Sequence, residues 1–247
     1  MTPKLPELSM FFLLYNEEDN IGPLLEAASV VAAKLAERYE LLPVIYEASS
    51  DRTLEIARAR ADRDERIRPV VQPISRPGMG NAIRVGFETA RYQHVFYADG
   101  DNQFDLKEFA SFLPHIGEPC VVAGYRIARQ DPKFRLFTSA VYNRIVRVLF
   151  GVRERDVDCA FRYVHRDVLK AVDLTCATGL GTTELLVRAR KAGFPIHEVG
   201  VNHFPRTAGE PVFEVKGSLN VFNFPKPSVV RDLLGEMRML RRTLHNS

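Results

Sequence analysis

The first half of the chain alternates between short apolar runs and segments with the apolar spacing of amphipathic helices. The apolar runs, which are typical of buried strands, lie at residues 8–14, 41–46, 67–71 and 94–98. The helical segments lie at residues 21–39, 52–60 and 81–90. Because strands that alternate with helices form βαβ units, this pattern predicts an α/β fold whose mostly parallel sheet carries helices on both faces.

The second half of the chain is less regular and predicts a smaller, mixed part. Strands are expected at residues 120–125, 157–163 and 196–203, and helices at residues 134–150, 166–172 and 184–192. A long loop is expected over residues 206–227, followed by a helix at residues 228–244 with Ser228 as its N-cap. We therefore expect one domain over residues 1–227 and a C-terminal amphipathic helix over residues 228–247.

Length and composition fit one domain with a sizeable core, since 46% of the 247 residues are hydrophobic. The formal net charge of +3 is a weak bias, which argues against nucleic acid and suits the binding of a small polyanion at one place. The three cysteines form no CxxC pair, so a reducing compartment is favoured. Because there is no signal-peptide pattern and no apolar run of about 18 residues, we expect a cytoplasmic protein.

Polar residues follow the ends of three predicted strands, namely Asn16, Glu47 and Asp99. Ligands of parallel sheets bind at the carboxyl ends of the strands, so these side chains are expected in one crevice. Asp99 and Asp101 flank Gly100, and such a pair suits Mg²⁺ or Mn²⁺, which takes one or two carboxylates together with substrate phosphates. The alternative is an Asp-Gly-Asp turn with solvated acids.

The order and spacing of these motifs resemble family 2 glycosyltransferases of the GT-A type. In chain order the motifs are Tyr15-Asn16-Glu17-Glu18, Glu47-Ala48-Ser49-Ser50-Asp51-Arg52-Thr53, Gly78-Met79-Gly80-Asn81-Ala82, Asp99-Gly100-Asp101-Asn102-Gln103, Gly124-Tyr125-Arg126, Asp158-Cys159-Ala160-Phe161-Arg162 and Arg206-Thr207-Ala208-Gly209. The resemblance covers residues 8–209. Within the family, the chain resembles the dolichyl- and polyprenyl-phosphate sugar synthases, such as dolichyl-phosphate mannose synthase.

This resemblance implies a GT-A, Rossmann-like domain that binds a nucleotide-sugar donor, either a UDP-sugar or a GDP-sugar. The residues that it implies for binding the nucleotide and its diphosphate are Tyr15, Asn16, Glu17, Glu47, Ser49, Asp51, Asp99, Gly100, Gln103, Arg126 and Arg206. It implies Asp99 and Asp101 as ligands of Mg²⁺ or Mn²⁺. It also implies a single displacement that inverts the anomeric centre of the sugar.

Three residues are the candidate catalytic groups. A leaving nucleoside diphosphate develops negative charge, which a cation held by Asp101 and an arginine fork from Arg126 would stabilise. Glu184 is the candidate general base for a hydroxyl acceptor. However, Leu185 follows it where relatives that glycosylate hydroxyl groups carry a second acid.

A phosphate acceptor is already anionic and needs no base, so the sequence favours a polyprenyl or dolichyl phosphate. Arg126, Arg135 and Arg162 are the residues expected to receive it. A soluble hydroxyl acceptor is the first alternative. The second alternative is a non-catalytic nucleotide-binding descendant of the family. It rests on departures from the family pattern: Tyr46 replaces an aspartate, Met79 replaces a lysine, and Glu210-Pro211-Val212 replaces a Ser-Lys pair.

Several of these side chains also have a purely structural interpretation. Ser49 and Asp51 can cap the following helix, and Glu17 can favour the first turn of its own helix. The arginines can form surface ion pairs, which contribute little individually. Glu184 can cap the helix that it precedes.

Two predicted helices are basic and amphipathic. The helix at residues 134–150 has the stripe Phe134, Phe137, Val141, Ile145 and Val148, flanked by Arg135, Arg144 and Arg147. The helix at residues 228–244 has the stripe Val230, Leu233, Leu234, Met237 and Leu240, beside Arg231, Arg238, Arg241 and Arg242. Helices of this kind can lie in a membrane interface, so peripheral contact with the cytoplasmic face of a membrane is expected. The alternative is that both stripes face the core.

Overall fold

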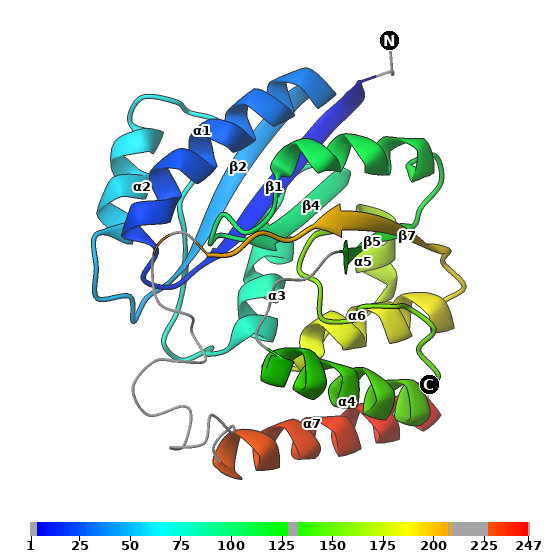
Figure 1. The fold of residues 1–247 in the computed structure, drawn as a ribbon. Coiled ribbons are helices and arrows are strands. Elements are labelled where there is room, and N and C mark those ends of the chain that lie inside the picture. The colour runs from blue at the N-terminus through cyan, green and yellow to red at the C-terminus, as the bar shows by residue number, and fades with distance from the viewer. Residues whose placement is uncertain (1–3, 128–132, 207, 209–226, 247) are drawn as a thin grey trace.

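The structure is a computed structural model, shown in Figure 1, and it describes residues 4–127, 133–206, 208 and 227–246. Its centre is a seven-stranded sheet of order β3-β2-β1-β4-β6-β5-β7. The strands are β1 (Leu5–Leu14), β2 (Ala36–Tyr46), β3 (Val70–Gln72), β4 (His94–Asp99), β5 (Val121–Ile127), β6 (Arg162–His165) and β7 (Ile196–Asn202). Strand β6 runs antiparallel to β4 and β5, and the other neighbouring pairs are parallel. The predicted fold class is confirmed.

Helices cover both faces of this sheet. The helices α1 (Glu18–Leu35) and α2 (Thr53–Ala61) and the 3₁₀ helix η1 (Leu106–His115) enclose one hydrophobic core. The helices α3 (Met79–Thr89), α5 (Arg166–Ala171) and α6 (Leu180–Lys191) enclose the other. Neighbouring residues of β1 alternate between the two cores, as Phe11 and Phe12 do, which explains why every position of the run at residues 8–14 except Ser9 is apolar.

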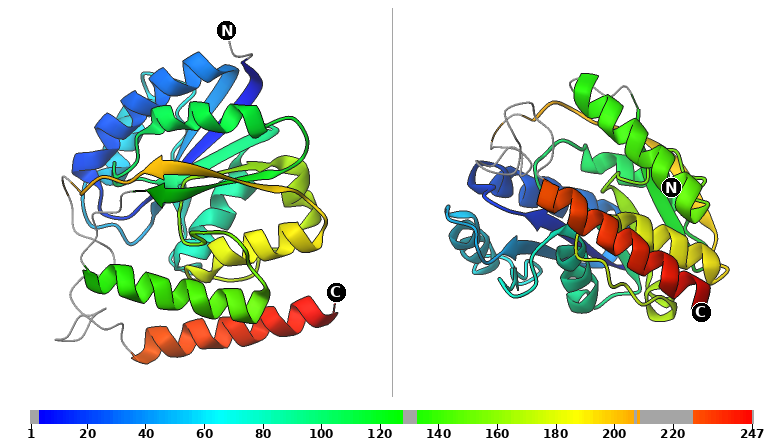
Figure 2. Two further views of the ribbon diagram at one scale, coloured as in Figure 1. Left: turned by 45° about the vertical axis from the view of Figure 1, so that its right-hand side comes forward. Right: turned by 90° about the horizontal axis from the view of Figure 1, so that it is seen from below.

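The helices α4 (Lys133–Phe150) and α7 (Pro227–Asn246) lie at the same end of the molecule (Figures 1 and 2). Helix α7 packs on α6 and buries Met237 and Leu240, so much of its predicted apolar stripe faces the core. Helix α4 behaves differently, because Phe137 is 66% exposed and Val148 is 72% exposed. Within the described ranges, no helix combines the length and the apolar character that crossing a bilayer requires.

Several predicted boundaries are wrong. The first helix ends at Leu35, because residues 36–40 pair with β1 as the start of β2. The strand predicted at residues 157–163 begins and ends later, at Arg162–His165, and η1 was missed. Helix α6 begins at Leu180, one turn before the predicted start, and α7 begins at Pro227, so Ser228 lies inside that helix and is not its N-cap. Most of the predicted loop at residues 206–227 lies outside the described residues.

Sheet register places the polar strand ends together. Leu13 of β1 lies opposite Asp99 of β4, and Leu14 lies opposite Ile45 of β2. The parallel strands β1, β2 and β4 therefore end at one edge of the sheet, and the loops that follow them meet there.

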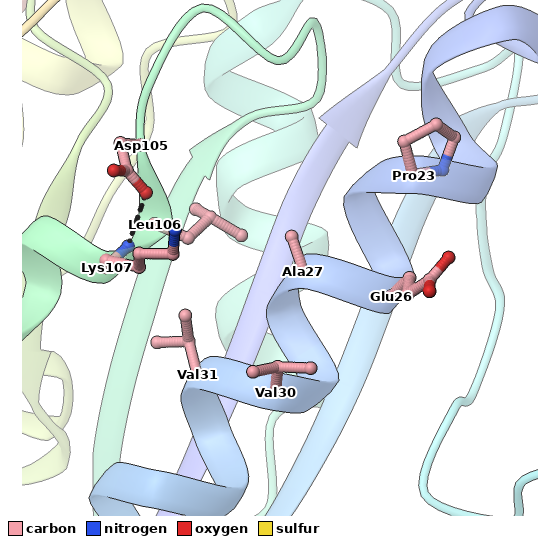
Figure 3. A pocket seen from close by; sticks show the side chains of 8 residues that line it. All are labelled: Pro23, Glu26, Ala27, Val30, Val31, Asp105, Leu106 and Lys107. Carbon is pink, nitrogen blue, oxygen red and sulfur yellow. Dashed lines mark hydrogen bonds between the residues drawn. The ribbon is translucent and has the colours of Figure 1, made fainter.

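A groove of about 380 Å³ lies elsewhere, between α1 and η1 (Figure 3). Its lining residues are Pro23, Glu26, Ala27, Val30, Val31, Asp105, Leu106 and Lys107. None of the predicted site residues lines it.

Candidate functional site

The loops after β1 and β2 lock together through side chains that the sequence predicted for the site. The backbone N–H of Ser50 donates to the Asn16 side chain at 2.8 Å, and the N–H of Glu18 donates to Asp51 at 2.9 Å. Asn16 has a positive φ of 53°, a conformation that asparagine tolerates better than most residues. Asn16 and Asp51 therefore each join one loop to the other, and their contacts here are structural ones to backbone N–H groups.

Aromatic rings stand beside this locked pair of loops. The Tyr15 and Tyr46 rings lie 5.8 Å apart between centroids, with a 50° tilt between their planes. Tyr46 thus packs against Tyr15 at the position where the family carries an aspartate. The exposed Glu47 carboxylate accepts a hydrogen bond from the N–H of Ile74 at 2.8 Å, which ties the end of β2 to the loop after β3.

Gly100 sits where only a glycine fits. Its N–H donates to the carbonyl oxygen of Leu13 at 3.0 Å, and a Cβ at this position would lie 2.4 Å from the Leu14 side chain. The chain can therefore turn tightly from β4 and present Asp99 and Asp101 next to one another. The buried Asp101 carboxylate accepts a hydrogen bond from the N–H of Gln103 at 3.1 Å.

Asp99 is in an electrostatically unfavourable place for a carboxylate. Burial and the nearby charge of Asp101 raise its pKa to about 8. Among the described residues, the Asp99 carboxylate accepts no hydrogen bond. The described part of the chain also contains no cluster of three or more His, Cys, Asp or Glu side chains that could hold a metal ion. Two adjacent carboxylates, one with its oxygens available, fit Mg²⁺ or Mn²⁺, whose other ligands come from substrate phosphates and water.

Arg206 joins two of the predicted residues. Its Nη1 lies 3.0 Å from Glu17 Oε1, and its Nη2 lies 3.0 Å from Asp101 Oδ2. Both carboxylates are largely buried. Burial raises the pKa of Glu17, and Asp101 adds to the rise, while the Asn20 amide and the Arg206 guanidinium oppose it. The sequence predicted Glu17 and Arg206 as donor-binding residues but not this bridge between them.

Gln103 holds the segment that carries Arg206. Its side-chain amide donates to the Phe204 carbonyl oxygen at 2.8 Å, and the Phe204 N–H donates back to the Gln103 carbonyl oxygen at 2.8 Å. Asn20 lies at the same place, since its amide donates to Glu17 at 2.6 Å. Asn20 was missed by the sequence analysis because its helical position carries no distinctive spacing.

Arg126 is close to this group but forms a tight pair of its own. Its Nε and Nη2 bind the two carboxylate oxygens of Asp156 at 2.7 and 2.9 Å, and both side chains are largely buried. Arg126 also lowers the pKa of Asp99, which places its charge beside the acidic pair. Asp156 was missed, because an isolated aspartate in an irregular segment gives no signal.

Two predicted site residues are structural. Glu184 is fully buried, and its carboxylate accepts hydrogen bonds from the Thr175 and Cys176 N–H groups, the Thr175 hydroxyl and Arg188. It therefore holds the segment before α6, and all four of these contacts are structural rather than directed at a ligand. Arg162, also fully buried, donates to the carbonyl oxygens of Val157 and Thr182, so it does not receive an acceptor phosphate. The side chain of Arg135 lies outside the described part of the structure.

Comparison with known proteins places this geometry in context. The sequence profile of the family described as "Glycosyl transferase family 2" matches residues 9–173. Dodecaprenyl-phosphate galacturonate synthase of Rhizobium johnstonii is 27% identical over 95% of this chain and 68% of its own length. Undecaprenyl-phosphate 4-deoxy-4-formamido-L-arabinose transferase of Pseudomonas aeruginosa is 28% identical over 87% of this chain and 62% of its own length. The present chain thus spans about two thirds of each relative.

A solved structure shares the fold. Glucosyl-3-phosphoglycerate synthase from Mycobacterium tuberculosis, in complex with Mn²⁺, UDP and glucosyl-3-phosphoglycerate, superimposes with a TM-score of 0.65 at 18% identity. The match covers 85% of this chain and 75% of that one. The expected GT-A arrangement is confirmed by this likeness.

Proposed function

The chain belongs to glycosyltransferase family 2, and from this membership we propose that it transfers a sugar from a nucleotide-sugar donor to a polyprenyl phosphate. The observation that carries the proposal is the convergence of Asp99, Asp101 and Arg206 at the carboxyl edge of the sheet. Ligands of open α/β sheets bind at that edge, and the charges found there suit a diphosphate.

We propose that Asp99 and Asp101 hold a divalent cation, Mg²⁺ or Mn²⁺. When bound, the cation would supply positive charge to the diphosphate oxygens of the donor. The raised pKa of Asp99 supports this role, because a carboxylate crowded by another acid is stabilised by a nearby cation. The Mn²⁺ and UDP in the solved structure of the same fold are consistent with it.

Arginines neutralise the negative charge that develops on the diphosphate as its bond to the sugar breaks. Arg206 donates a hydrogen bond to Asp101, so a diphosphate bound beside the acidic pair would contact the Arg206 guanidinium. Arg126 is locked by Asp156, which orients it and leaves its remaining N–H groups for a phosphate oxygen. The acceptor oxygen attacks the anomeric carbon opposite the breaking bond to the diphosphate, so one bond forms, one breaks and the centre inverts.

A phosphate acceptor fits the site better than a hydroxyl acceptor. A hydroxyl needs a base to take its proton, and the residue predicted for that purpose, Glu184, is fully buried in a structural contact. A polyprenyl phosphate brings its own anionic oxygen. The names of the two relatives also support a polyprenyl phosphate, since one is a dodecaprenyl-phosphate galacturonate synthase and the other an undecaprenyl-phosphate 4-deoxy-4-formamido-L-arabinose transferase.

A polyprenyl phosphate resides in a membrane, and helix α4 offers a surface that suits contact with a membrane. Its outward stripe is made of Phe137, Val141, Ile145 and Val148, all at least 40% exposed, and Arg144 and Arg147 lie exposed within the same helix. Apolar residues flanked by arginines match a bilayer that contains anionic lipid. We propose peripheral association at the cytoplasmic face of a membrane through α4.

The test is calorimetric titration with UDP, GDP and their sugars, with and without Mn²⁺, followed by sugar transfer to a polyprenyl phosphate. Asp99→Asn is the informative variant, because Asp99 accepts no hydrogen bond in the described structure, whereas Asp101 also holds Arg206. Asp105→Asn is the matched control, since Asp105 lies nearby in sequence and its side chain caps η1, away from the acidic pair. We expect Mn²⁺-dependent binding of one nucleotide that Asp99→Asn loses and Asp105→Asn keeps. No nucleotide binding by the wild type would refute the proposal.

A further inference from the structure

The glycine motif at the start of α3 is pressed onto the backbone of residues 176–178. The Gly80 N–H donates to the Ala177 carbonyl oxygen at 2.8 Å. A Cβ on Gly78, whose φ is +93°, would lie 2.4 Å from that oxygen, and a Cβ on Gly80 would lie 2.3 Å from the Cys176 carbonyl oxygen. No side chain fits between the two segments, so any displacement of residues 176–178 is passed directly to the glycines.

The glycine motif in turn belongs to the edge of the sheet where the site lies. Gln72, the last residue of β3, lies opposite Tyr46, and its side-chain amide donates to the Gly78 carbonyl oxygen at 2.9 Å. The motif is therefore fixed on one side by the strand end next to Tyr46. Its other side rests on residues 176–178.

Two carboxylates, those of Glu184 and Glu236, hold the segment at residues 175–178 in place. Glu184 of α6 accepts the N–H groups of Thr175 and Cys176. Glu236 of α7 accepts the N–H of Ala177 at 2.8 Å, the N–H of Thr178 at 3.2 Å and the Thr178 hydroxyl at 2.5 Å. Four consecutive N–H groups thus end on two acids, and the second acid comes from the C-terminal helix.

One peptide unit connects Glu236 to the glycine motif. The Ala177 carbonyl oxygen, which binds Gly80, and the Thr178 N–H, which binds Glu236, belong to the same rigid plane. We propose that Glu236 is a positioning residue that couples helix α7 to the glycine motif and so sets how tightly the donor binds. This inference rests on the proposed transferase function and assigns α7 a part in regulating its site.

The direction of control follows from how α7 is attached. Met237 and Leu240 bury its inner face on α6, while Arg238, Arg241 and Arg242 are exposed. Helix α7 lies at the same end of the molecule as α4, the helix proposed to meet a bilayer (Figures 1 and 2). Anionic lipid that attracts these arginines would hold α7 in place, and Glu236 would pass that restraint to the glycine motif.

The experiment measures the donor KM and kcat of the full chain, with and without vesicles of anionic phospholipid. We expect Glu236→Ala to raise the donor KM about tenfold, as a loss of one charge-assisted contact implies, with kcat nearly unchanged. Glu236→Gln should remain close to wild type, because its amide oxygen still accepts the two N–H groups and its NH₂ can donate to the Thr178 hydroxyl. Asp232→Ala is the matched control, since it removes an acid of α7 whose only described ion pair is with Arg231 on the surface.

Amide hydrogen exchange gives a readout that does not depend on activity. In Glu236→Ala the Gly80 amide should exchange faster than in wild type, although Gly80 does not touch Glu236, and Thr178→Val should give a smaller change. Vesicles should lower the donor KM of the wild type but not of Glu236→Ala. Equal KM and equal Gly80 exchange in Glu236→Ala and Asp232→Ala would overturn the coupling. Absence of nucleotide binding by the wild type itself would instead overturn the proposed function.

Discussion

Replacement of Arg206 by alanine is expected to cost the fold about 3 to 5 kcal/mol, the usual effect of removing one partner from a buried ion pair. The guanidinium lies between Glu17 and Asp101 at 3.0 Å from each, and its side chain is only 15% exposed. Without it, two nearby carboxylates face each other with no intervening charge. For a domain of this size the loss corresponds to a fall in Tm of roughly 6 to 20 °C.

The stability that Arg206→Ala loses should depend on pH, and Glu17 decides the direction of this dependence. Burial already raises the pKa of this carboxyl above 4.5, and Arg206 is one of the groups that restrain the rise. Removing Arg206 therefore raises the pKa of Glu17 further. A carboxyl whose folded pKa is raised contributes stability that is complete below its unfolded pKa and is lost as the pH climbs through the folded pKa. The variant should thus come nearest to wild type in acid and fall furthest behind near neutrality.

Urea unfolding of wild type and variant at pH 5 and at pH 7.5 measures both effects. Arg38→Ala is the control, because the Arg38–Glu7 pair has the same 3.0 Å separation but an arginine that is 69% exposed, so it should lose less than about 1 kcal/mol. If Arg206→Ala loses no more stability than Arg38→Ala, the bridge contributes nothing and the reasoning is wrong. A deficit that is equal at both pH values would refute the assignment to Glu17.

Three further changes test other parts of the structure. We expect the Tyr15–Tyr46 pair to stack on the base of the donor, and stacking of a base on an aromatic ring is worth roughly 1–3 kcal/mol. Tyr46→Ala should therefore weaken nucleotide binding about fivefold or more, and an unchanged Kd by calorimetry would refute this role. Glu184→Ala should lower the free energy of unfolding by about 3 kcal/mol or more, because it leaves buried N–H groups and Arg188 without their acceptor. Wild-type stability of this variant in urea would contradict the structural role of Glu184. The double change Phe137→Ser and Val148→Ser should reduce co-sedimentation with anionic vesicles. It should shift the free energy of unfolding by only about 0.5 kcal/mol, because both side chains are exposed. Undiminished co-sedimentation would count against membrane contact through α4.

The sheet could be predicted from the sequence because its central strands are buried on both faces. In a run such as residues 8–14, every position except Ser9 is apolar, since the side chains enter two cores in turn. The start of β2 could not be predicted, because residues 36–40 contain Glu37, Arg38 and Glu40 and read as the end of an amphipathic helix. Pairing with β1 decides their conformation, and that contact is absent from local spacing.

The acidic pair and the loops around it could be predicted because each follows a strand end. Asn16 and Asp51 join the loops after β1 and β2, and Asp99 ends the neighbouring strand β4 at the same edge of the sheet. Glu184 and Arg162 illustrate the limit of this reasoning. A charged residue in a motif looks the same in sequence whether it faces a ligand or a ring of backbone groups, and only the fold shows that these two are fully buried in structural contacts.

The charges at the site are arranged so that a cation and a diphosphate would assist each other. Arg206 is held by Glu17 and Asp101, so an anion alone must compete with these carboxylates for its N–H groups. Asp99, by contrast, is a carboxylate with a raised pKa beside a second acid, so it is the group that gains most from a cation. Charge that a cation neutralises on the acidic pair no longer competes for Arg206, which then meets the phosphate oxygens. This is why we expect Mn²⁺ to strengthen nucleotide binding, and why equal affinity with and without Mn²⁺ would count against the arrangement.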